Sequence, residues 1–397
     1  MSWKSVALAD VSDVFNGKTP SKGDQRGVGH PVLKIKDVGE NGSFKGPFES
    51  FVDPGLADKF SDKHLELDDS LILNAAHNSD YVGSKQYRAE QAVVGSLPTG
   101  EWLIARANTE KLNPRFLNYW LQSPQARFQI KQLVKGIHLY PKDVMRLEIP
   151  LPPLPEQKRI AAILDKADAI RRKRQQAIQL ADDFLRALFL DMFGDPVTNP
   201  KGWEVRPSGE LFSVPPRIGT TTPADGQGYL VVRVGEIGKL DINFSKCGRA
   251  QLKDSELERF ILRSGDTVLA RAIGSKKQLG KASFFSGYSE DVYIDSHVMR
   301  LRPNVKMCNP EWFYRFVSSD GGKSLLQKAG GETAVQFNIN AKQAASILIP
   351  LPPIELQNEF IVFCQRHSKS KTHLSKQAGD FEMLFSSLSQ KAFSGQL

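Results

Sequence analysis

Residues 149–157 have the sequence Ile-Pro-Leu-Pro-Pro-Leu-Pro-Glu-Gln, and a related stretch, Ile-Pro-Leu-Pro-Pro-Ile-Glu-Leu-Gln, occupies residues 349–357. The two copies of this proline motif begin 200 residues apart in a chain of 397 residues. A long apolar pattern of helical period follows each copy, and a stretch of mixed strand and turn character precedes each. An internal repeat of this size sets the architecture, because each copy should form a structural unit of the same kind.

The repeat extends upstream of the proline motif. Four matches support it: Trp3 with Trp203, 33–38 with 232–237, 69–75 with 266–272, and Asn113-Pro114 with Asn309-Pro310. The offsets drift between 196 and 200 residues, as small loop insertions would produce. Outside these anchors the two halves differ, so we expect a shared skeleton that carries different loops.

The repeat predicts a mixed α/β fold with four segments. Short β-branched runs separated by Gly, Pro, Asp and Asn predict globular domains at residues 1–148 and 196–348. The proline motif and a long helix occupy residues 149–195 and again 349–397. A pseudo-twofold axis should relate the two halves.

The first long helix is predicted from about residue 156 to residue 192. Pro155 suits a first turn, where its missing N–H is not needed, and Glu156 suits the positive end of the helix dipole. The sequence Gly194-Asp195-Pro196 should end the helix. At a rise of ~1.5 Å per residue, this helix would be roughly 55 Å long.

Apolar residues recur in both helices at alternating spacings of three and four, which predicts a coiled-coil seam. The predicted seam is Ile160, Ile163, Ala167, Ile170, Arg174, Ala177, Ala181, Phe184 and Leu188, then Phe360, Phe363, His367, Ser370, Leu374, Gln377, Phe381, Leu384 and Leu388. Neither helix is apolar all round, so each needs a partner. We expect the two helices to pack antiparallel; the alternative is that each docks on its own globular domain. His367 is interpreted as a polar layer of the seam rather than a metal ligand.

Composition restricts the class of protein. The net charge of +9 and the pI near 9.3 favour a polyanionic partner. Three scattered cysteines argue against disulfides and zinc and for a reducing, cytoplasmic compartment. The N-terminal segment lacks the apolar run of a secretion signal, and no long uncharged apolar run predicts a membrane span.

Motifs of catalysis are missing from the sequence. It holds no Gly-x-x-x-x-Gly-Lys-Ser/Thr phosphate loop, and its Pro-Pro pairs follow Leu or Val rather than the Asn or Asp of amine methyltransferases. Its histidines lack metal-ligand spacing. We therefore expect no catalytic residue, no metal site and no cofactor on this chain, which favours a protein that recognises a target and leaves chemistry to partners.

Polar, basic and aromatic residues gather in the predicted loops of both globular domains, where DNA contacts commonly lie. The candidates in the first domain are Lys18, Thr19, Lys22, Lys34, Lys36, His77, Asn78, Lys85, Tyr87, Arg88, His138 and Tyr140. Those in the second domain are Arg217, Thr220, Thr221, Arg233, Arg271, Ser275, Lys276, Lys277, Gln278, Gln336 and Asn338. Each could instead be an ordinary surface residue. The basic run at 171–174 is interpreted as a solvated helix face or a protein contact.

The order of globular half, proline motif, long helix and a second such set resembles the DNA-specificity subunit of type I restriction–modification systems. The resemblance covers the whole chain. Its most specific stretch is residues 149–157 followed by Arg159-Ile160, and it recurs more loosely at 349–357. In the second copy Glu355-Leu356 replaces Pro-Glu and Asn358-Glu359 replaces Lys-Arg, which leaves the layout intact.

The resemblance implies a function that the residues alone do not give. Each globular half would be a target recognition domain for one part of a split, asymmetric sequence in double-stranded DNA. The helices would set the unread gap and dock two methyltransferase subunits, which carry S-adenosylmethionine. Two restriction subunits, which use ATP and Mg²⁺, would complete the complex. Two other hypotheses remain open at this point: a helical scaffold without sequence-specific DNA contact, and an enzyme with an unrecognised site, such as a nuclease.

Overall fold

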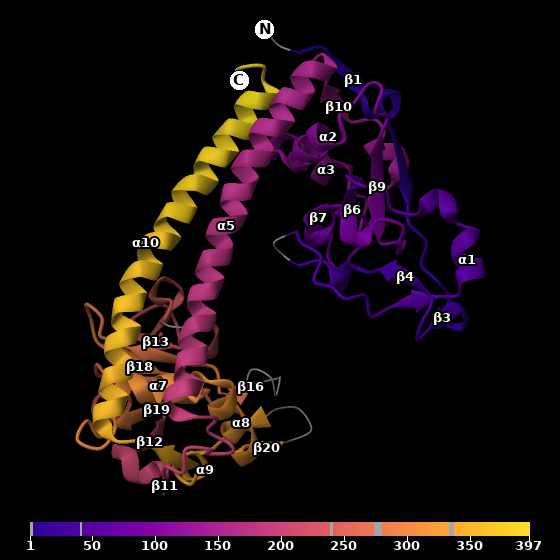
Figure 1. The fold of residues 1–397 in the computed structure, drawn as a ribbon. Coiled ribbons are helices and arrows are strands. Elements are labelled where there is room, and N and C mark those ends of the chain that lie inside the picture. The colour runs from indigo at the N-terminus through magenta and orange to yellow at the C-terminus, as the bar shows by residue number, and fades with distance from the viewer. Residues whose placement is uncertain (1–2, 40–41, 239–240, 274–279, 333–336) are drawn as a thin grey trace. The chain divides into compact units, whose positions relative to one another are not determined.

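The computed structural model describes all residues except 1–2, 40–41, 239–240, 274–279 and 333–336 (Figure 1). By contacts the chain divides into two compact units. Unit 1 comprises Met1–Gln176 and Ser375–Leu397, and unit 2 comprises Ala177–Leu374. Each unit therefore contains one globular domain together with part of both long helices. The structure confirms the mixed α/β class, whereas the four ranges expected from the sequence stay a prediction.

The long helices are α5 (Leu154–Phe193) and α10 (Ile354–Phe393), each of 40 residues. Helix α5 begins two residues before the predicted start and ends one residue after the predicted end. Pro155 lies in its first turn as expected. Gly194 follows the helix with a φ of +78°, a left-handed conformation that glycine adopts without strain and that commonly ends a helix.

The two long helices pack against each other in both units, with opposite chain directions. In unit 1, Arg171 forms an ion pair with Glu382 at 3.3 Å, and Arg174 donates to the carbonyl of Gln377 at 2.8 Å. In unit 2, the ring of Phe189 lies 5.6 Å from that of Phe360. The predicted antiparallel pairing is confirmed, and the ends of both helices also join the globular cores.

The predicted seam is wrong at four of its apolar positions. Ile170, Phe184, Phe363 and Leu384 are 44%, 55%, 42% and 64% exposed. In each case the next residue along the helix is the more buried one. Besides the predicted Ile160, Ala167, Ala181 and Phe360, which are buried, the buried or half-buried residues of the two helices include Leu164, Arg171, Leu185, Cys364, Lys371 and Phe385.

Charged side chains explain this shift of register. The guanidinium of Arg171 lies 5.1 Å from the ring of Phe385 while it pairs with Glu382. Lys371 forms an ion pair with Asp182 at the corresponding place in unit 2. The long aliphatic stems of Arg and Lys can cover apolar surface while their charged ends form ion pairs. Arg171 and Lys371 therefore occupy inward-facing positions of the helices, although hydrophobicity alone would place Ile170 there.

Unit 1 is built on an antiparallel four-stranded sheet in the order β2-β9-β6-β7. A smaller sheet has the order β3-β5-β4-β8, and helix α2 packs against β6 and β9. The strands are β1 (Ser5–Ala7), β2 (Ser12–Asn16), β3 (Gln25–Arg26), β4 (His30–Leu33), β5 (Phe51–Val52), β6 (Ser70–Leu73), β7 (Gln86–Arg88), β8 (Leu97–Pro98), β9 (Trp102–Ala107) and β10 (Glu148–Pro150). The short helices are α1 (Pro54–Asp58), α2 (Pro114–Gln122), α3 (Pro124–Leu133) and α4 (Pro141–Val144).

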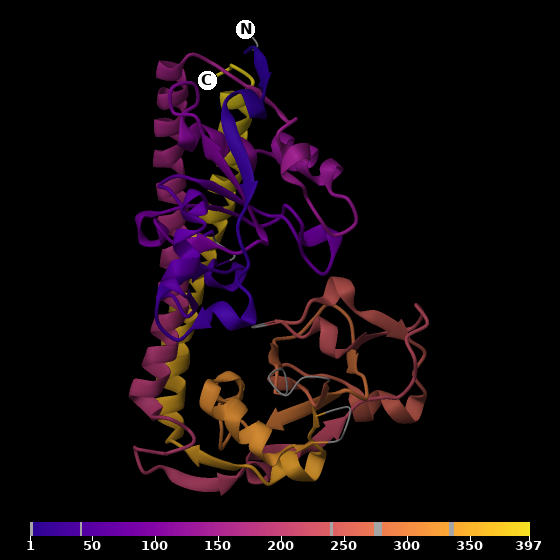
Figure 2. The ribbon, with the colours of Figure 1, turned by 90° about the vertical axis from the view of Figure 1, so that its right-hand side faces the viewer.

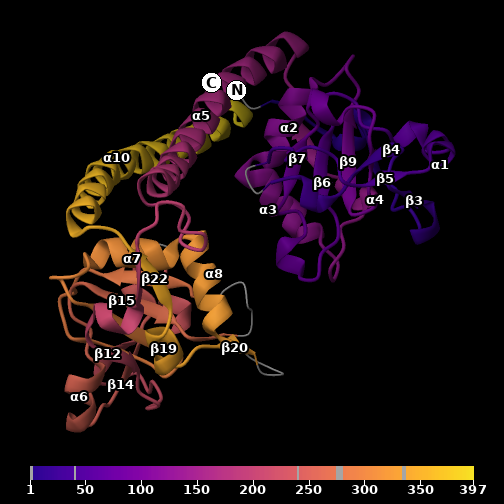
Figure 3. The same cartoon turned by 60° about the horizontal axis from the view of Figure 1, so that its bottom comes forward.

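Unit 2 repeats this plan with the sheet order β12-β19-β15-β17. Strands β12, β15 and β19 are labelled in Figure 3. Two three-stranded sheets, β14-β13-β18 and β16-β21-β20, and the pair β11-β22 complete it. The strands are β11 (Glu204–Pro207), β12 (Phe212–Ile218), β13 (Tyr229–Val232), β14 (Gly248–Ala250), β15 (Asp266–Ala270), β16 (Ala272–Ile273), β17 (Ala282–Phe285), β18 (Val292–Ile294), β19 (Val298–Pro303), β20 (Gly331–Glu332), β21 (Phe337–Asn338) and β22 (Leu348–Leu351). The helices are α6 (Asp254–Phe260), α7 (Pro310–Ser318), α8 (Asp320–Ala329) and α9 (Ala341–Ala345).

The glutamine that ends each proline motif ties a long helix to its globular domain. Gln157 is buried; its Oε1 accepts from the backbone N–H of Asn113 at 2.7 Å, and its Nε2 donates to the carbonyls of Lys111 and Pro152. Gln357 is also buried and accepts from the backbone N–H of Asn309 at 2.9 Å. The shared motif therefore closes the same joint in both units.

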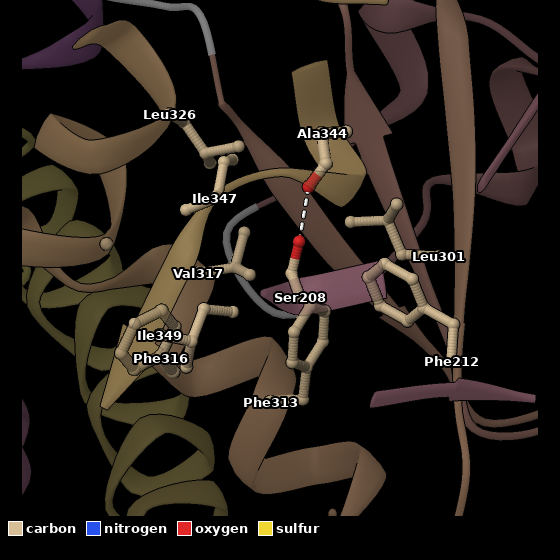
Figure 4. A pocket seen from close by; sticks show the side chains of 11 residues that line it. Ser208, Phe212, Leu301, Phe313, Phe316, Val317, Leu326, Ala344, Ile347 and Ile349 are labelled. Atoms are coloured by element: carbon tan, nitrogen blue, oxygen red, sulfur yellow. Dashed lines mark hydrogen bonds between the residues drawn. The ribbon is translucent and has the colours of Figure 1, made fainter. Parts of the chain in front are cut away.

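The core of unit 2 contains a small apolar gap, drawn in Figure 4. Its volume is about 10 Å³, and Phe212, Leu301 and Phe313 are among the side chains that line it. The hydroxyl of Ser208 donates to the carbonyl of Ala344 at its rim (Figure 4). A gap of this size barely admits a water, so we assign it to core packing rather than to ligand binding.

Strand β1 and the C-terminal end of α10 belong to unit 1 and are drawn in Figure 2. The guanidinium of Arg159 donates to the carbonyl of Leu397 at 3.0 Å. Across the described ranges of the chain, no helix combines the length and apolar character needed to cross a membrane.

Candidate nucleic-acid interface

Asn74, which follows β6, joins several loops of unit 1 at one junction. Its side chain is 5% exposed. Its Nδ2 donates to Oδ1 of Asn16 and to the carbonyl of Gly100, both at 2.9 Å. Its backbone carbonyl accepts from the N–H of Leu139 at 2.7 Å. The loops after β2, after β6, before β9 and before α4 therefore meet at this residue.

Gly17 fixes the entry of the loop that holds Lys18, Thr19 and Lys22. Its N–H donates to the carbonyl of Trp102 at 3.0 Å, and an added Cβ would lie 2.3 Å from the carbonyl oxygen of Pro98. Only glycine fits such a close backbone approach. Thr19 accepts from the N–H of Gly100 at 2.9 Å, so the loop is anchored while Lys18 and Lys22 stay exposed.

Unit 2 has the same junction, with Arg271 in the place of Asn74. Its Nη1 donates to the carbonyl of Ser296 at 2.8 Å and its Nε to the carbonyl of Ile339 at 3.1 Å. Its backbone carbonyl accepts from the N–H of Ile339 at 2.9 Å. Gly219 stands where Gly17 stands in unit 1, and its added Cβ would lie 1.9 Å from the carbonyl oxygen of Ile294.

Arg271 is half-buried, and burial lowers the pKa of its guanidinium. The group is directed at two loop carbonyls of its own unit. This placement favours a role in holding the loops over the expected direct contact with DNA.

Two of the predicted DNA contacts are wrong because their side chains are buried. Tyr87 is 1% exposed and belongs to the core of unit 1, where burial raises the pKa of its hydroxyl to about 12. Thr220 is 3% exposed; its hydroxyl donates to Glu256 at 2.6 Å and accepts from the N–H of Thr222 at 3.0 Å. The pairing of β7 with β6 places the side chain of Tyr87 in the core. The hydroxyl of Thr220 is already hydrogen-bonded within unit 2.

A concave region of about 570 Å³ in unit 1 brings several predicted residues together. Thr19, Lys34 and Lys36 line it, and so does Arg26, which the sequence did not single out. Lys36 pairs with Glu49 at 2.6 Å, and this contact raises the pKa of the lysine and lowers that of the carboxyl group. Because both side chains are well exposed, water screens the pair and leaves it weak.

The basic residues Lys34 and Arg233 occupy matching turns in the two units. The backbone N–H of Lys34 donates to Asp37 at 2.8 Å, and that of Arg233 donates to Glu236 at 2.7 Å. Each opens a single 3-10 turn, Ile35–Asp37 and Val234–Glu236 respectively. The guanidinium of Arg233 also pairs with Glu236 at 3.2 Å. The turns are thus held from within, and Lys34 is half-buried whereas Arg233 is exposed.

The remaining predicted contacts differ in exposure. Arg88 faces α5, because its guanidinium lies 3.6 Å from the carboxylates of Asp68 and Asp165. Lys85 donates to the carbonyl of Ile35 at 3.1 Å. The exposed candidates are His77, Asn78, His138, Tyr140 and Thr221, and the half-buried ones are Arg217 and Asn338. Ser275, Lys276, Lys277, Gln278 and Gln336 lie outside the described residues.

The sequence did not identify Asn74 or Arg26 as candidate site residues. The repeat offered a signal for Asn74, because the matched stretches 69–75 and 266–272 align it with Arg271. Arg26 lies in a strand of two residues, which carries no periodic pattern. Among the residues that the structure describes, no cluster of three or more His, Cys, Asp or Glu side chains is placed to hold a metal ion.

Comparisons with known proteins agree with this architecture. A family model described as "Type I restriction modification DNA specificity domain" matches residues 1–180. The EcoKI specificity subunit of Escherichia coli strain K12 is 23% identical over 428 residues, covering 100% of this chain and 89% of the relative. The EcoBI specificity subunit of Escherichia coli is 22% identical over 435 residues, covering 100% and 86%.

Solved structures share the fold. A chain from a study of complex assembly and conformational transition of the type I restriction–modification system superposes with a TM-score of 0.55, at 18% identity, over 100% of this chain and 98% of that chain. The S subunit from M. genitalium gives a TM-score of 0.53 at 14% identity, over 99% and 96%. Residues 1–180 therefore match a DNA specificity domain of type I restriction–modification systems, and over its whole length the chain is similar to specificity subunits of such systems.

Proposed function

We propose that this chain recognises a bipartite, asymmetric sequence in double-stranded DNA, with each globular domain contacting one half of the target. One observation carries the proposal: both units build the same loop junction at the ends of equivalent strands but surround it with different side chains. A common scaffold with different loops suits two recognition domains whose half-sites differ.

The chemistry of the exposed loop residues fits duplex DNA. Lys18 and Lys22 suit phosphates, whereas Asn78 suits the hydrogen-bonding edge of adenine. The net charge of +9 supports a polyanionic partner. As a specificity subunit the chain supplies recognition rather than a catalytic step. S-adenosylmethionine, ATP and Mg²⁺ would be bound by partner subunits, and the complex would act in the cytoplasm.

The long helices would set the unread gap between the half-sites and dock two methyltransferase subunits, with two restriction subunits in the full complex. Large apolar side chains are exposed along both helices, which supports a protein partner there. Those on α5 are Ile170, Leu180, Phe184 and Leu190, and those on α10 are Val362, Phe363, Met383 and Leu384.

An exchange of residues 1–148 for the matching domain of another specificity subunit tests the proposal. The hybrid, expressed with its methyltransferase partner, should methylate a target in which one half is new and the other half is unchanged. The reciprocal exchange of residues 196–348 should alter the other half. A change in both halves after one exchange, or in neither, would contradict separate recognition. Random protection of DNA in a footprint of the wild-type complex would favour a scaffold without sequence-specific contact.

A further inference from the structure

We propose that Asn74 and Arg271 are equivalent positioning residues, which determine specificity by holding the DNA-contacting loops of their units in place without contacting a base. This inference rests on the proposed function. It assigns to one side chain per unit the task of aligning loops that come from distant parts of the chain.

The hydrogen bonds at the two junctions correspond pair by pair. The backbone N–H of Asn74 donates to the carbonyl of Glu101, and that of Arg271 donates to the carbonyl of His297, both at 2.9 Å. Their carbonyls accept from Leu139 and Ile339, respectively. Glu101 and His297 directly precede β9 and β19, and Leu139 and Ile339 lie in the loops before α4 and α9. The backbone frame is therefore the same in both units, and the side chain is what differs.

The two side chains share one anchor and differ in the other. Both donate to a carbonyl just before the central strand, that of Gly100 in unit 1 and that of Ser296 in unit 2. The second bond of Asn74 goes to Asn16, which ends β2. The second bond of Arg271 goes to Ile339, in the loop before α9. The choice of residue thus selects which further loop is fixed to the strand end.

Direct base contact fits Asn74 poorly. Its amide group has two N–H donors, and the two bonds to Asn16 and Gly100 occupy them. The side chain is also almost fully buried. Loops that carry Lys18, His77 and His138 diverge from this point, so a shift at the junction would move several candidate contacts together. Recognition groups must be held to within about 0.5 Å to work, so a larger shift at the junction would impair recognition at several positions.

The test uses the full chain with its methyltransferase partner and measures methylation of a DNA library that varies every target position. We expect Asn74→Ala to reduce discrimination about tenfold or more at several positions of one half-site, and to leave the other half-site unchanged. The matched control is Asn108→Ala in the same unit, because the side-chain oxygen of Asn108 accepts from the N–H of Glu110 within its own turn. The control should keep the wild-type pattern. Thermal unfolding of both variants shows whether they are folded.

A second pair of variants tests unit 2 independently. Arg271→Met keeps much of the side-chain volume, removes both donors and should relax only the other half-site. Arg206→Met is its control, because Arg206 lies on β11 and pairs with Glu204 at 3.0 Å, away from the junction. If Asn74→Ala fails to fold, Asn74→Ser, which keeps one donor, replaces it.

Each outcome decides between positioning and its alternatives. Loss of preference at a single base position would show a direct contact and overturn the inference. A lower melting temperature with unchanged preference would show a purely structural role and overturn it as well. A wild-type complex without any sequence preference would refute the proposed function itself, whereas a selective wild type with equally selective variants would refute only the positioning role.

Discussion

Gln157 shows how a single residue of the proline motif can hold a joint together. We predict that Gln157→Leu lowers the free energy of unfolding by about 1–3 kcal/mol, because the part-buried N–H of Asn113, the part-buried carbonyl of Lys111 and the buried carbonyl of Pro152 lose their partner. Urea unfolding of the full chain measures the change. The control Gln175→Leu, at an exposed position of α5, should change the free energy by no more than about 0.5 kcal/mol. Equal effects of the two substitutions would show that the joint is dispensable.

His30 gives unit 1 a predicted dependence on pH. Its ring stacks on that of His64 at a centroid distance of 4.4 Å, and burial together with the neighbouring histidine lowers the pKa of His30 below its usual value of 6.5. The unfolded chain therefore binds a proton more readily at this site, so the stability from neutral His30 is present above pH 6.5 and is lost as the pH falls from there through the lower pKa of the folded protein.

Thermal unfolding of the full chain between pH 7.5 and 5.5 checks the sign of this effect. The wild type should lose stability toward the acidic end, and His30→Phe, which cannot be protonated, should lose less. A variant that follows the wild-type curve would assign the pH dependence to other groups.

At the scale of elements, the observed seam predicts that the same substitution, Leu to Ala, has different effects on stability at two positions of the long helices. Leu164→Ala should cost about 2–5 kcal/mol, because Leu164 is fully buried in the core of unit 1. Leu384→Ala should change the free energy by no more than about 0.5 kcal/mol, because Leu384 is an exposed residue of the same unit. Chemical denaturation of the two variants compares them directly. The seam predicted from the sequence instead requires Leu384→Ala to cause the larger loss of unfolding free energy. That result would support the predicted seam and contradict the observed one.

The sequence predicted the long helices well because local signals define them. Proline in the first turn and glycine after the last turn act within a few residues, so the bounds of α5 and the antiparallel pairing could be anticipated. The register could not. Alternating spacings of three and four residues can be fitted to more than one seam along the same helix, for example one through Ile170 or one through Arg171. The choice between these two residues depends on Glu382 and Phe385, which lie far away in the sequence.

The dependence on residues far away in the sequence also explains why the candidate interface could be predicted only in part. The sequence identified the loops, since Gly17 and its neighbours carry turn residues, but burial depends on strand pairing and distant partners. Tyr87 faces the core, and Glu256 holds the hydroxyl of Thr220. Asn74 gains its importance only when Asn16 and Gly100 are brought to it.

For the whole molecule, the net charge of +9 predicts DNA binding that weakens steeply with salt. Lys18→Ala and Lys22→Ala should each reduce the slope of log affinity against log salt by about 1 if the lysine contacts a phosphate, with no change in the preferred sequence. Binding titrations of the complex at several salt concentrations measure the slope. A changed sequence preference would instead assign the lysine to a base.

The proposed role of the long helices as a spacer can be tested by lengthening both. The helices pair antiparallel, and the units divide them after Gln176 in α5 and after Leu374 in α10. One heptad inserted at both places keeps the faces of the helices in phase and adds ~10 Å at ~1.5 Å per residue. We expect the unread gap of the target to widen by up to about three base pairs, at ~3.4 Å each, while the bases recognised in each half stay the same. A methylation map of the lengthened complex measures both properties. An unaltered gap would remove the spacer role from the helices, and altered half-sites would show that the insertion had disturbed the recognition domains.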